Sequence, residues 1–142
     1  MTGLPATREA IARLIPHQGA MCLLDRVETC DAEGIACSSA THRDTANPLR
    51  RDGALPAICG AEYALQAMAL HGALTDGTPQ GRGFVAALTG VEIGVERLDD
   101  IAGDLAVSAV ALSRESRGFI YRFTIEGDGR MLLSGRATVV LA

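Results

Sequence analysis

The 142-residue sequence contains no lysine, and all 13 of its basic residues are arginine. This absence excludes Schiff-base chemistry and any lysine nucleophile. Apolar runs are short, and none reaches the roughly 18 residues that a membrane-spanning helix needs. The net charge is −4 and the basic residues form no block, so neither a nucleic-acid-binding protein nor a membrane protein is expected.

Cysteine is sparse, with four residues at wide spacings and no C-x-x-C pair. We therefore expect no zinc site, no cofactor, and buried thiols in the reduced state. Arg8, Glu9 and Arg13 occupy the N-terminal stretch in which a signal peptide would need a long apolar run. These features together predict a cytoplasmic protein.

Hydrophobic residues make up 48% of the chain, which is enough to build a core. The length is that of one ordinary domain, and no linker or internal repeat divides it, so we expect a single domain over 1–142. The predicted elements are a helix from a Thr7 cap to about residue 14, strands at 20–30 and 34–42, a loop at 44–56, a helix at 57–74, a Gly-rich loop at 76–83, and strands at 84–97, 105–113, 119–126 and 131–141.

The predicted helix at 57–74 is apolar nearly all round. It is rich in Ala, Leu and Met, and its clearly polar residues are Glu62, Gln66 and His71. A helix that is apolar on most sides is buried, and a single helix is buried on most sides only when a sheet wraps around it. The pattern therefore predicts an α+β hotdog fold, in which a curved antiparallel sheet wraps around one long central helix.

Glu62 stands within this apolar helix. A carboxyl group is rarely buried without a partner or a role, and one that faces a cleft is a candidate general acid or base. Gln66 follows four residues later on the same helix face and is expected to orient the carboxyl group by a hydrogen bond. A structural interpretation, in which Glu62 reaches solvent or pairs with an arginine, remains open.

Two histidines are candidates to act with Glu62. His42 ends the second predicted strand, and it is interpreted either as a base that faces Glu62 across a cleft or as an ordinary turn histidine. His17, which follows a proline next to the first strand, is expected to have a supporting role. At the start of the long helix, the main-chain N–H groups of Ala57 and Gly60 are expected to donate to a carbonyl oxygen, although any helix start offers such donors.

The segment 15–27 reads IPHQGAMCLLDRV. It resembles the Leu-Pro-His-x-x-x-Phe-Leu-Leu-x-Asp-Arg-Val segment of the bacterial 3-hydroxyacyl-carrier-protein dehydratases. In that family the central helix follows a Met-Pro-Gly, with a catalytic acid six residues after the proline and a Gln four residues later. Pro56, Glu62 and Gln66 keep these spacings. The resemblance covers nearly the whole chain and implies a lyase of fatty-acid-type biosynthesis that dehydrates 3-hydroxyacyl thioesters of acyl carrier protein or CoA.

A closer resemblance is to the dehydratase-like hotdog proteins of aryl polyene biosynthesis clusters. The stretches that suggest it are 16–25, 47–50 and 60–69, which read PHQGAMCLLD, NPLR and GAEYALQAMA. This resemblance implies polyenoyl chains bound to a carrier protein. It also implies sites at a dimer interface, either in a homodimer or in a heterodimer of two hotdog subunits.

The sequence departs from the dehydratases at one important position. They carry a catalytic His in Gly-His-Phe-Pro-x-x-Pro, eight residues before the helix proline, where this chain has Pro48. The nearest candidate is His42, six residues earlier, which would need a rerouted loop to reach the same place. Ala57 also replaces the Gly whose N–H meets the thioester oxygen in that family.

Three functions follow from these residues. In the first, His42 takes the C2 proton of a 3-hydroxyacyl thioester and Glu62 protonates the departing hydroxyl. In the second, the chain is a hotdog acyl-thioesterase in which Glu62 activates a water that Asn47 orients. In the third, the chain is a catalytically impaired partner of an active hotdog dehydratase, because the His motif is missing.

Overall fold

A computed structural model describes residues 3–79 and 83–141 of the chain. The predicted Gly-rich loop at 76–83 therefore lies partly outside the described residues. The six strands are β1 (Arg26–Cys30), β2 (Gly34–Ser39), β3 (Gly83–Ile93), β4 (Leu105–Glu115), β5 (Gly118–Gly127) and β6 (Arg130–Leu141). They form one antiparallel sheet in the order β1-β2-β4-β5-β6-β3.

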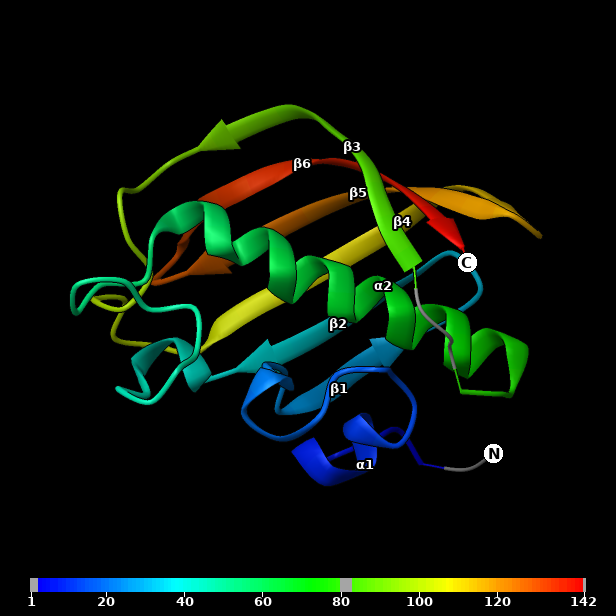
Figure 1. The fold of residues 1–142 in the computed structure, drawn as a ribbon, viewed down its shortest axis with the longest axis horizontal. Helices are drawn as coiled ribbons and strands as arrows, with labels where there is room; N and C mark the ends of the chain where they lie inside the picture. Colours follow the sequence, from blue (N-terminus) through cyan, green and yellow to red (C-terminus); the bar gives the residue numbers. More distant parts are fainter. Residues whose placement is uncertain (1–2, 80–82, 142) are drawn as a thin grey trace.

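The long helix α2 (Gly60–Asp76) lies across the concave face of this sheet, which curves around it (Figure 1). Most of its side chains are buried, and Glu62, Leu65 and Ala69 are the partly exposed residues along one side. The predicted hotdog architecture is confirmed. The helix ends at Gly77, whose left-handed φ of 74° suits a residue without a Cβ.

Close packing of the helix start against the sheet explains the glycine at its first position. A Cβ on Gly60 would lie 3.0 Å from Leu133 and 3.2 Å from Ile125, whose side chains project from β6 and β5. The apolar residues of β5 alternate along the strand, so that its inward face meets the helix. These inward residues are Phe119, Tyr121, Phe123 and Ile125.

The strand predicted at 20–30 is wrong over its first half. Residues Gly19–Met21 form a 3-10 turn, and β1 begins only at Arg26. Residues 22–24 are buried, and the side chain of Gln66 supplies hydrogen bonds to the main chain of Met21 and Leu23 in place of a neighbouring strand. The strand predicted at 34–42 likewise ends at Ser39, where a second 3-10 turn, Thr41–Arg43, begins.

The predicted N-terminal helix is shorter than expected. It is α1 (Arg8–Ala12), and the Thr7 hydroxyl caps it by accepting a hydrogen bond from the Ala10 N–H at 3.1 Å. The 3-10 turn Ala57–Cys59 precedes α2 in place of its predicted first turn. None of the helices within the described ranges is long and apolar enough to cross a membrane.

Strand β3 lies at one edge of the sheet and arches over the helix in Figure 1. It pairs with β6 on one side, and its other side has no strand neighbour within 3–79 and 83–141. Several large apolar side chains of β3 are exposed: Phe84, Val85, Leu88 and Ile93. An exposed apolar edge of this kind is a surface that natural proteins cover by assembly or by other means.

Candidate active site

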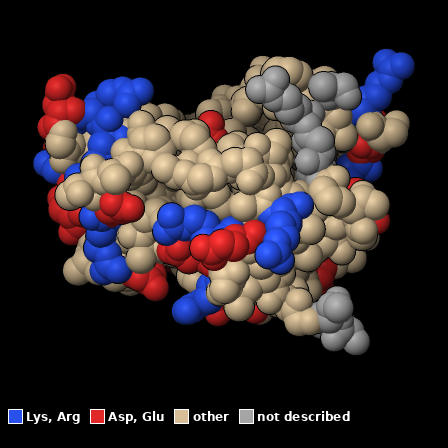
Figure 2. Space-filling view, turned by 60° about the horizontal axis from the view of Figure 1, so that its bottom comes forward, with Lys and Arg blue, Asp and Glu red and all other residues tan. Residues whose placement is uncertain are grey.

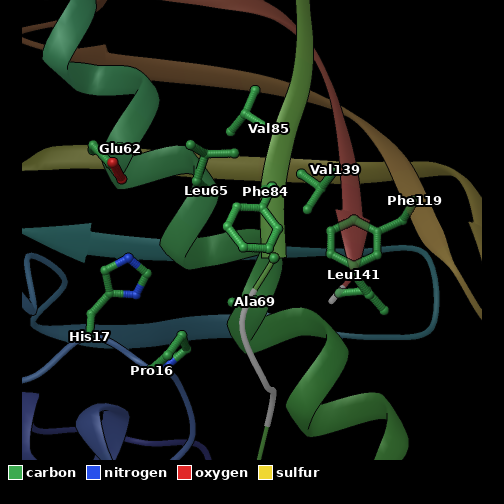
Figure 3. A pocket seen from close by; sticks show the side chains of 11 residues that line it. Pro16, His17, Glu62, Leu65, Ala69, Phe84, Val85, Phe119, Val139 and Leu141 are labelled. Atoms are coloured by element: carbon green, nitrogen blue, oxygen red, sulfur yellow. The ribbon is translucent and has the colours of Figure 1, made fainter.

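A cavity of about 350 Å³ lies between α2 and the strands β3, β5 and β6. Its lining residues are Pro16, His17, Glu62, Leu65, Ala69, Gly83, Phe84, Val85, Phe119, Val139 and Leu141. Glu62 and His17 lie at the same end of the cavity, and Phe119 and Leu141 lie at the opposite end (Figure 3). The cavity therefore has one polar end and mostly apolar walls, which is typical of sites for small molecules with an apolar tail.

Glu62 reaches the cavity from the first full turn of α2. Its side chain is partly exposed, and it forms no hydrogen bond or ion pair with the described residues. The structural interpretation in which Glu62 pairs with an arginine therefore finds no support in the described part of the chain. The carboxyl group faces a cavity rather than the outer surface, which leaves it available to a substrate.

His17 lines the cavity beside Glu62, on the segment between α1 and the 3-10 turn at 19–21. The Nδ1 atom of its ring is buried and has no hydrogen-bond partner among the described residues. Its neighbour Gln18 anchors the segment, because the Gln18 Nε2 donates to the carbonyl of Ala12 at 2.6 Å and to that of Ile15 at 3.3 Å. The structure thus brings together Glu62 and the histidine that was expected to be only supporting.

His42 lies elsewhere, in the 3-10 turn after β2, and is fully buried. Its Nε2 donates to the Ile101 carbonyl at 2.9 Å, and its Nδ1 has no hydrogen-bond partner among the residues that the structure describes. Burial lowers the pKa of His42 below its ordinary value of 6.5, so the ring is neutral near pH 7. His42 is not among the residues that line the cavity with Glu62, so its interpretation as the base finds no support in the described part of the chain.

Gln66 has a role different from the predicted one. Its side chain is fully buried and points at the segment after His17, where it accepts from the Leu23 N–H at 2.8 Å and donates to the Met21 carbonyl at 2.7 Å. Both ends of the amide are therefore engaged with main chain, and no hydrogen bond joins Gln66 to Glu62. The reason is that residues 21–23 precede the first strand and have no neighbouring strand among the described residues, so a helix side chain supplies their hydrogen bonds.

Asn47 is buried in the loop before α2 and also lies away from the cavity. Its Nδ2 donates to the Thr41 carbonyl at 3.0 Å and to the Tyr63 hydroxyl at 3.1 Å, while its Oδ1 accepts from the Leu49 N–H at 2.9 Å. The side chain holds the loop to the helix. It is not placed to orient a water beside Glu62.

The two main-chain donors predicted at the helix start are engaged within the chain. The Ala57 N–H donates to the Glu96 carbonyl at 3.0 Å, and the Gly60 N–H donates back into the turn that precedes it. The prediction of free donors at Ala57 and Gly60 is therefore not met in this chain. The cause is that carbonyl groups of the 3-10 turn at 57–59 accept from the Gly60 N–H, and a carbonyl of the segment after β3 accepts from the Ala57 N–H.

Sequence reasoning missed the apolar walls of the cavity. Phe84, Phe119 and Val139 come from three different strands, and nothing in their local sequence separates cavity-lining residues from ordinary core residues. The one available signal was alternation along β5, which places Phe119 on the inward face. Which inward residues border open space depends on how the strands curve past the helix.

Neither a cluster of metal-ligating side chains nor a surface of one charge is seen in the described part of the chain. Within residues 3–79 and 83–141, no group of three or more His, Cys, Asp or Glu side chains is placed to hold a metal ion. Figure 2 shows acidic and basic side chains interspersed on one face of the molecule, around a broad uncharged area. No field of a single sign covers that face.

Comparisons with solved structures find the same fold. A chain of the dehydratase heterocomplex ApeI:P from Xenorhabdus doucetiae matches with a TM-score of 0.81 and 20% identity, over 93% of this chain and 90% of that chain. AziG from S. sahachiroi matches with a TM-score of 0.57 and 14% identity, over 81% and 88%. A mutant of the thioesterase SAV0944 from Staphylococcus aureus subsp. aureus Mu50 matches with a TM-score of 0.59 and 14% identity, over 81% and 90%. At these identities the matches show the hotdog fold alone.

A comparison of whole sequences separates the activities that this fold supports. No curated protein matches the chain. The family model of the ApeP dehydratases matches residues 9–142, which is nearly all of the sequence. The resemblance drawn from the 15–27 segment and the central helix is thereby confirmed. The chain belongs to the ApeP dehydratase family.

Proposed function

We propose that this chain dehydrates 3-hydroxyacyl thioesters carried on acyl carrier protein, in polyene-type biosynthesis, with His17 and Glu62 as its catalytic pair. One observation carries the assignment: the two side chains lie at one end of a cavity whose other walls are mostly apolar. The polar end suits the reacting carbons of the substrate, and the apolar walls suit its acyl tail. A CoA thioester presents the same reacting group and is an alternative substrate.

In the proposed reaction, His17 removes a proton from C2 of the substrate and Glu62 gives a proton to the hydroxyl group on C3. The C3–O bond breaks, water leaves, and the C2–C3 double bond forms. Return of the proton from His17 to Glu62 restores the pair. Each group is expected to contribute about 10²–10⁴-fold to the rate.

The negative charge that develops on the thioester oxygen also needs donors. Because the Ala57 and Gly60 N–H groups are used within the chain, we assign this role to a second subunit rather than to this helix start. This assignment makes the assembly part of the active site.

We propose that the second subunit is another hotdog protein, which pairs along the open edge of β3. The exposed side chains of Leu88 and Ile93 and the unpaired side of the strand support this interface. The similar chain from Xenorhabdus doucetiae belongs to a heterocomplex, which favours two different subunits over a homodimer. Four unpaired cysteines support an assembly in the reducing cytoplasm.

The proposal is tested by replacing Glu62 with glutamine in the assembled protein and following the dehydration of a 3-hydroxyacyl-carrier-protein substrate. We expect turnover to fall about 10²–10⁴-fold, because Gln cannot donate the proton. Glu33→Gln is the matched control, since Glu33 is exposed in the β1–β2 turn, away from the cavity. Unchanged turnover in Glu62→Gln would refute the catalytic assignment.

One alternative keeps specific support. The chain has Pro48 where the bacterial 3-hydroxyacyl-carrier-protein dehydratases carry their motif histidine, and the predicted thioester donors are engaged, which favours a subunit that supports an active partner without reacting itself. In that case Glu62→Gln leaves turnover of the complex intact, while removal of the chain abolishes it. A thioesterase has less support, because Asn47 is held away from the cavity. Release of free thiol from acyl thioesters would reveal it.

A further inference from the structure

The end of the cavity far from Glu62 and His17 is lined by an aromatic side chain that packs against a second ring. Phe119 lies there, at the start of β5, and is only 7% exposed (Figure 3). It pairs in register with Val139 of β6, which lines the same cavity. A substrate tail that extends away from the polar end therefore meets the Phe119 ring.

The Phe119 ring is backed by a second ring on the same face of β5. Tyr121 follows two residues later and is fully buried, and the two rings make an edge contact with centroids 5.3 Å apart and an interplanar angle of 85°. Tyr121 therefore packs directly against the Phe119 ring.

Tyr121 is itself fixed to the helix. Its hydroxyl donates to the Nδ1 of His71, at 2.5 Å, and the Nε2 of His71 donates to the Asp31 carbonyl at 2.8 Å. His71 is fully buried near the end of α2, and Asp31 lies in the turn between β1 and β2. Tyr121 is thus tied to the turn between β1 and β2 through His71, by two hydrogen bonds in series that reach across the core.

The helix that forms one wall gives a scale for the part of the cavity that it lines. Glu62, Leu65 and Ala69 line it in turn, and the seven residue steps from Glu62 to Ala69 span about 10 Å along the helix axis. An extended chain of single bonds advances about 1.2 Å per bond, so roughly eight bonds fit this distance.

We propose that Phe119 sets the upper limit of acyl-chain length in this site, at about eight carbons beyond the reacting pair, and that Tyr121 and His71 position it. This inference rests on the proposed function for the placement of the thioester at the polar end. Phe119 is a specificity residue, since it touches only the tail of the substrate. Tyr121 and His71 act through it.

The experiment compares a series of thioesters of increasing chain length in the wild type and in Phe119→Ala and Phe119→Leu. Turnover uses 3-hydroxyacyl substrates, and binding uses amide analogues that cannot react, measured by calorimetry on the assembled protein. In the wild type, each added carbon should raise affinity about fourfold until the limit is reached, after which affinity falls. In both variants the limit should move to longer chains, with short chains bound as before.

Phe123→Leu is the matched control, because Phe123 is a buried phenylalanine on the same face of β5 that does not line the cavity. It should keep the wild-type limit. Tyr121→Phe keeps the ring but removes the hydrogen bond to His71. Affinity should therefore fall less sharply beyond the chain-length limit, and the limit should shift less than in Phe119→Ala. Phe119→Leu is the milder change if Phe119→Ala folds poorly.

Binding and turnover separate the two proposals. A limit that shifts in the Phe119 variants but not in Phe123→Leu supports the inference, even if no substrate is dehydrated, in which case only the catalytic proposal fails. A limit that is the same in wild type and both Phe119 variants overturns the inference, whatever the turnover.

Discussion

Gln66 accepts a hydrogen bond from the main-chain N–H of Leu23 at 2.8 Å, and this contact ties the central helix to the segment that carries His17. The same side chain donates to the Met21 carbonyl at 2.7 Å. Gln66 lies one helical turn after Glu62, so a single stretch of α2 presents the carboxyl group and fixes the path of the chain that presents the imidazole. The position of the His17 imidazole relative to the Glu62 carboxyl group therefore depends on the two hydrogen bonds of Gln66.

Replacing Gln66 with leucine should therefore disturb catalysis more than its effect on folding explains. Two buried main-chain groups lose their partners, which we expect to lower the free energy of unfolding by about 1–3 kcal/mol. A displacement of His17 by about 1 Å would lower kcat by about 10²-fold. Measurements of kcat and KM well below the melting temperature test this, with urea denaturation to confirm that the protein is folded.

Met68→Leu is the control for Gln66→Leu, because Met68 is fully buried on the same helix and forms no hydrogen bond with its side chain. It should leave kcat within about twofold of wild type, since a swap of similar volume is well tolerated. Equal losses of kcat in the two variants would mean that Gln66 only fills space.

The two candidate histidines should respond in opposite ways to substitution. His17→Asn removes the proposed base and should lower kcat about 10²–10⁴-fold with little change in stability, since the ring is only partly buried. His42→Asn should lower stability, because the bond to the Ile101 carbonyl is lost, while the folded protein keeps its kcat. Parallel assays of dehydration and thermal unfolding distinguish them. The opposite pattern would restore His42 as the base.

The sequence was sufficient for the layers of the fold but not for the choice of histidine. The apolar stretch at 57–74 predicted a buried helix and a wrapped sheet, because few folds can bury every face of a single helix. The run at 21–24 was mistaken for a strand, since its partners lie on Gln66, more than 40 residues away. The contact of that segment with the helix places His17, and not His42, in the same cavity as Glu62. No local sequence pattern indicates a contact between residues so far apart in the chain.

His42 should make stability depend on pH in the weakly acidic range. Its pKa is lowered in the folded protein, mainly by burial, whereas in the unfolded chain the ring titrates near 6.5. The unfolded state therefore binds a proton first as the pH falls. This contribution to stability is present above pH 6.5 and is lost as the pH falls from 6.5 toward the lowered pKa of the folded state.

The measurement is the free energy of unfolding from pH 7.5 to pH 5 for wild type and His42→Gln. The wild type should lose stability over this range more steeply than the variant, which has no ring to protonate. Parallel curves for the two proteins would contradict a neutral, buried His42.

The proposed interface is tested by a charge on β3. Leu88→Lys should prevent assembly, because an ammonium group would be buried against the partner strand. Leu112→Lys is the matched control: Leu112 is 44% exposed and Leu88 is 38% exposed, but Leu112 lies on β4, which has strand neighbours on both sides. Light scattering of the co-purified subunits gives the assembled mass. Normal assembly of Leu88→Lys would exclude this edge.

The open side of β3 also bears on how a cell must produce this protein. On this side, within the described residues, the main-chain N–H and C=O groups of β3 have no strand partner and are flanked by apolar side chains. Such an edge can form hydrogen bonds with another extended segment, including the same edge of a second newly made copy. The protein is therefore prone to aggregate between folding and assembly with its partner subunit. Synthesis of both subunits nearby and in equal numbers shortens that period, whereas overproduction of this chain alone should yield insoluble material instead of a reserve of free subunits.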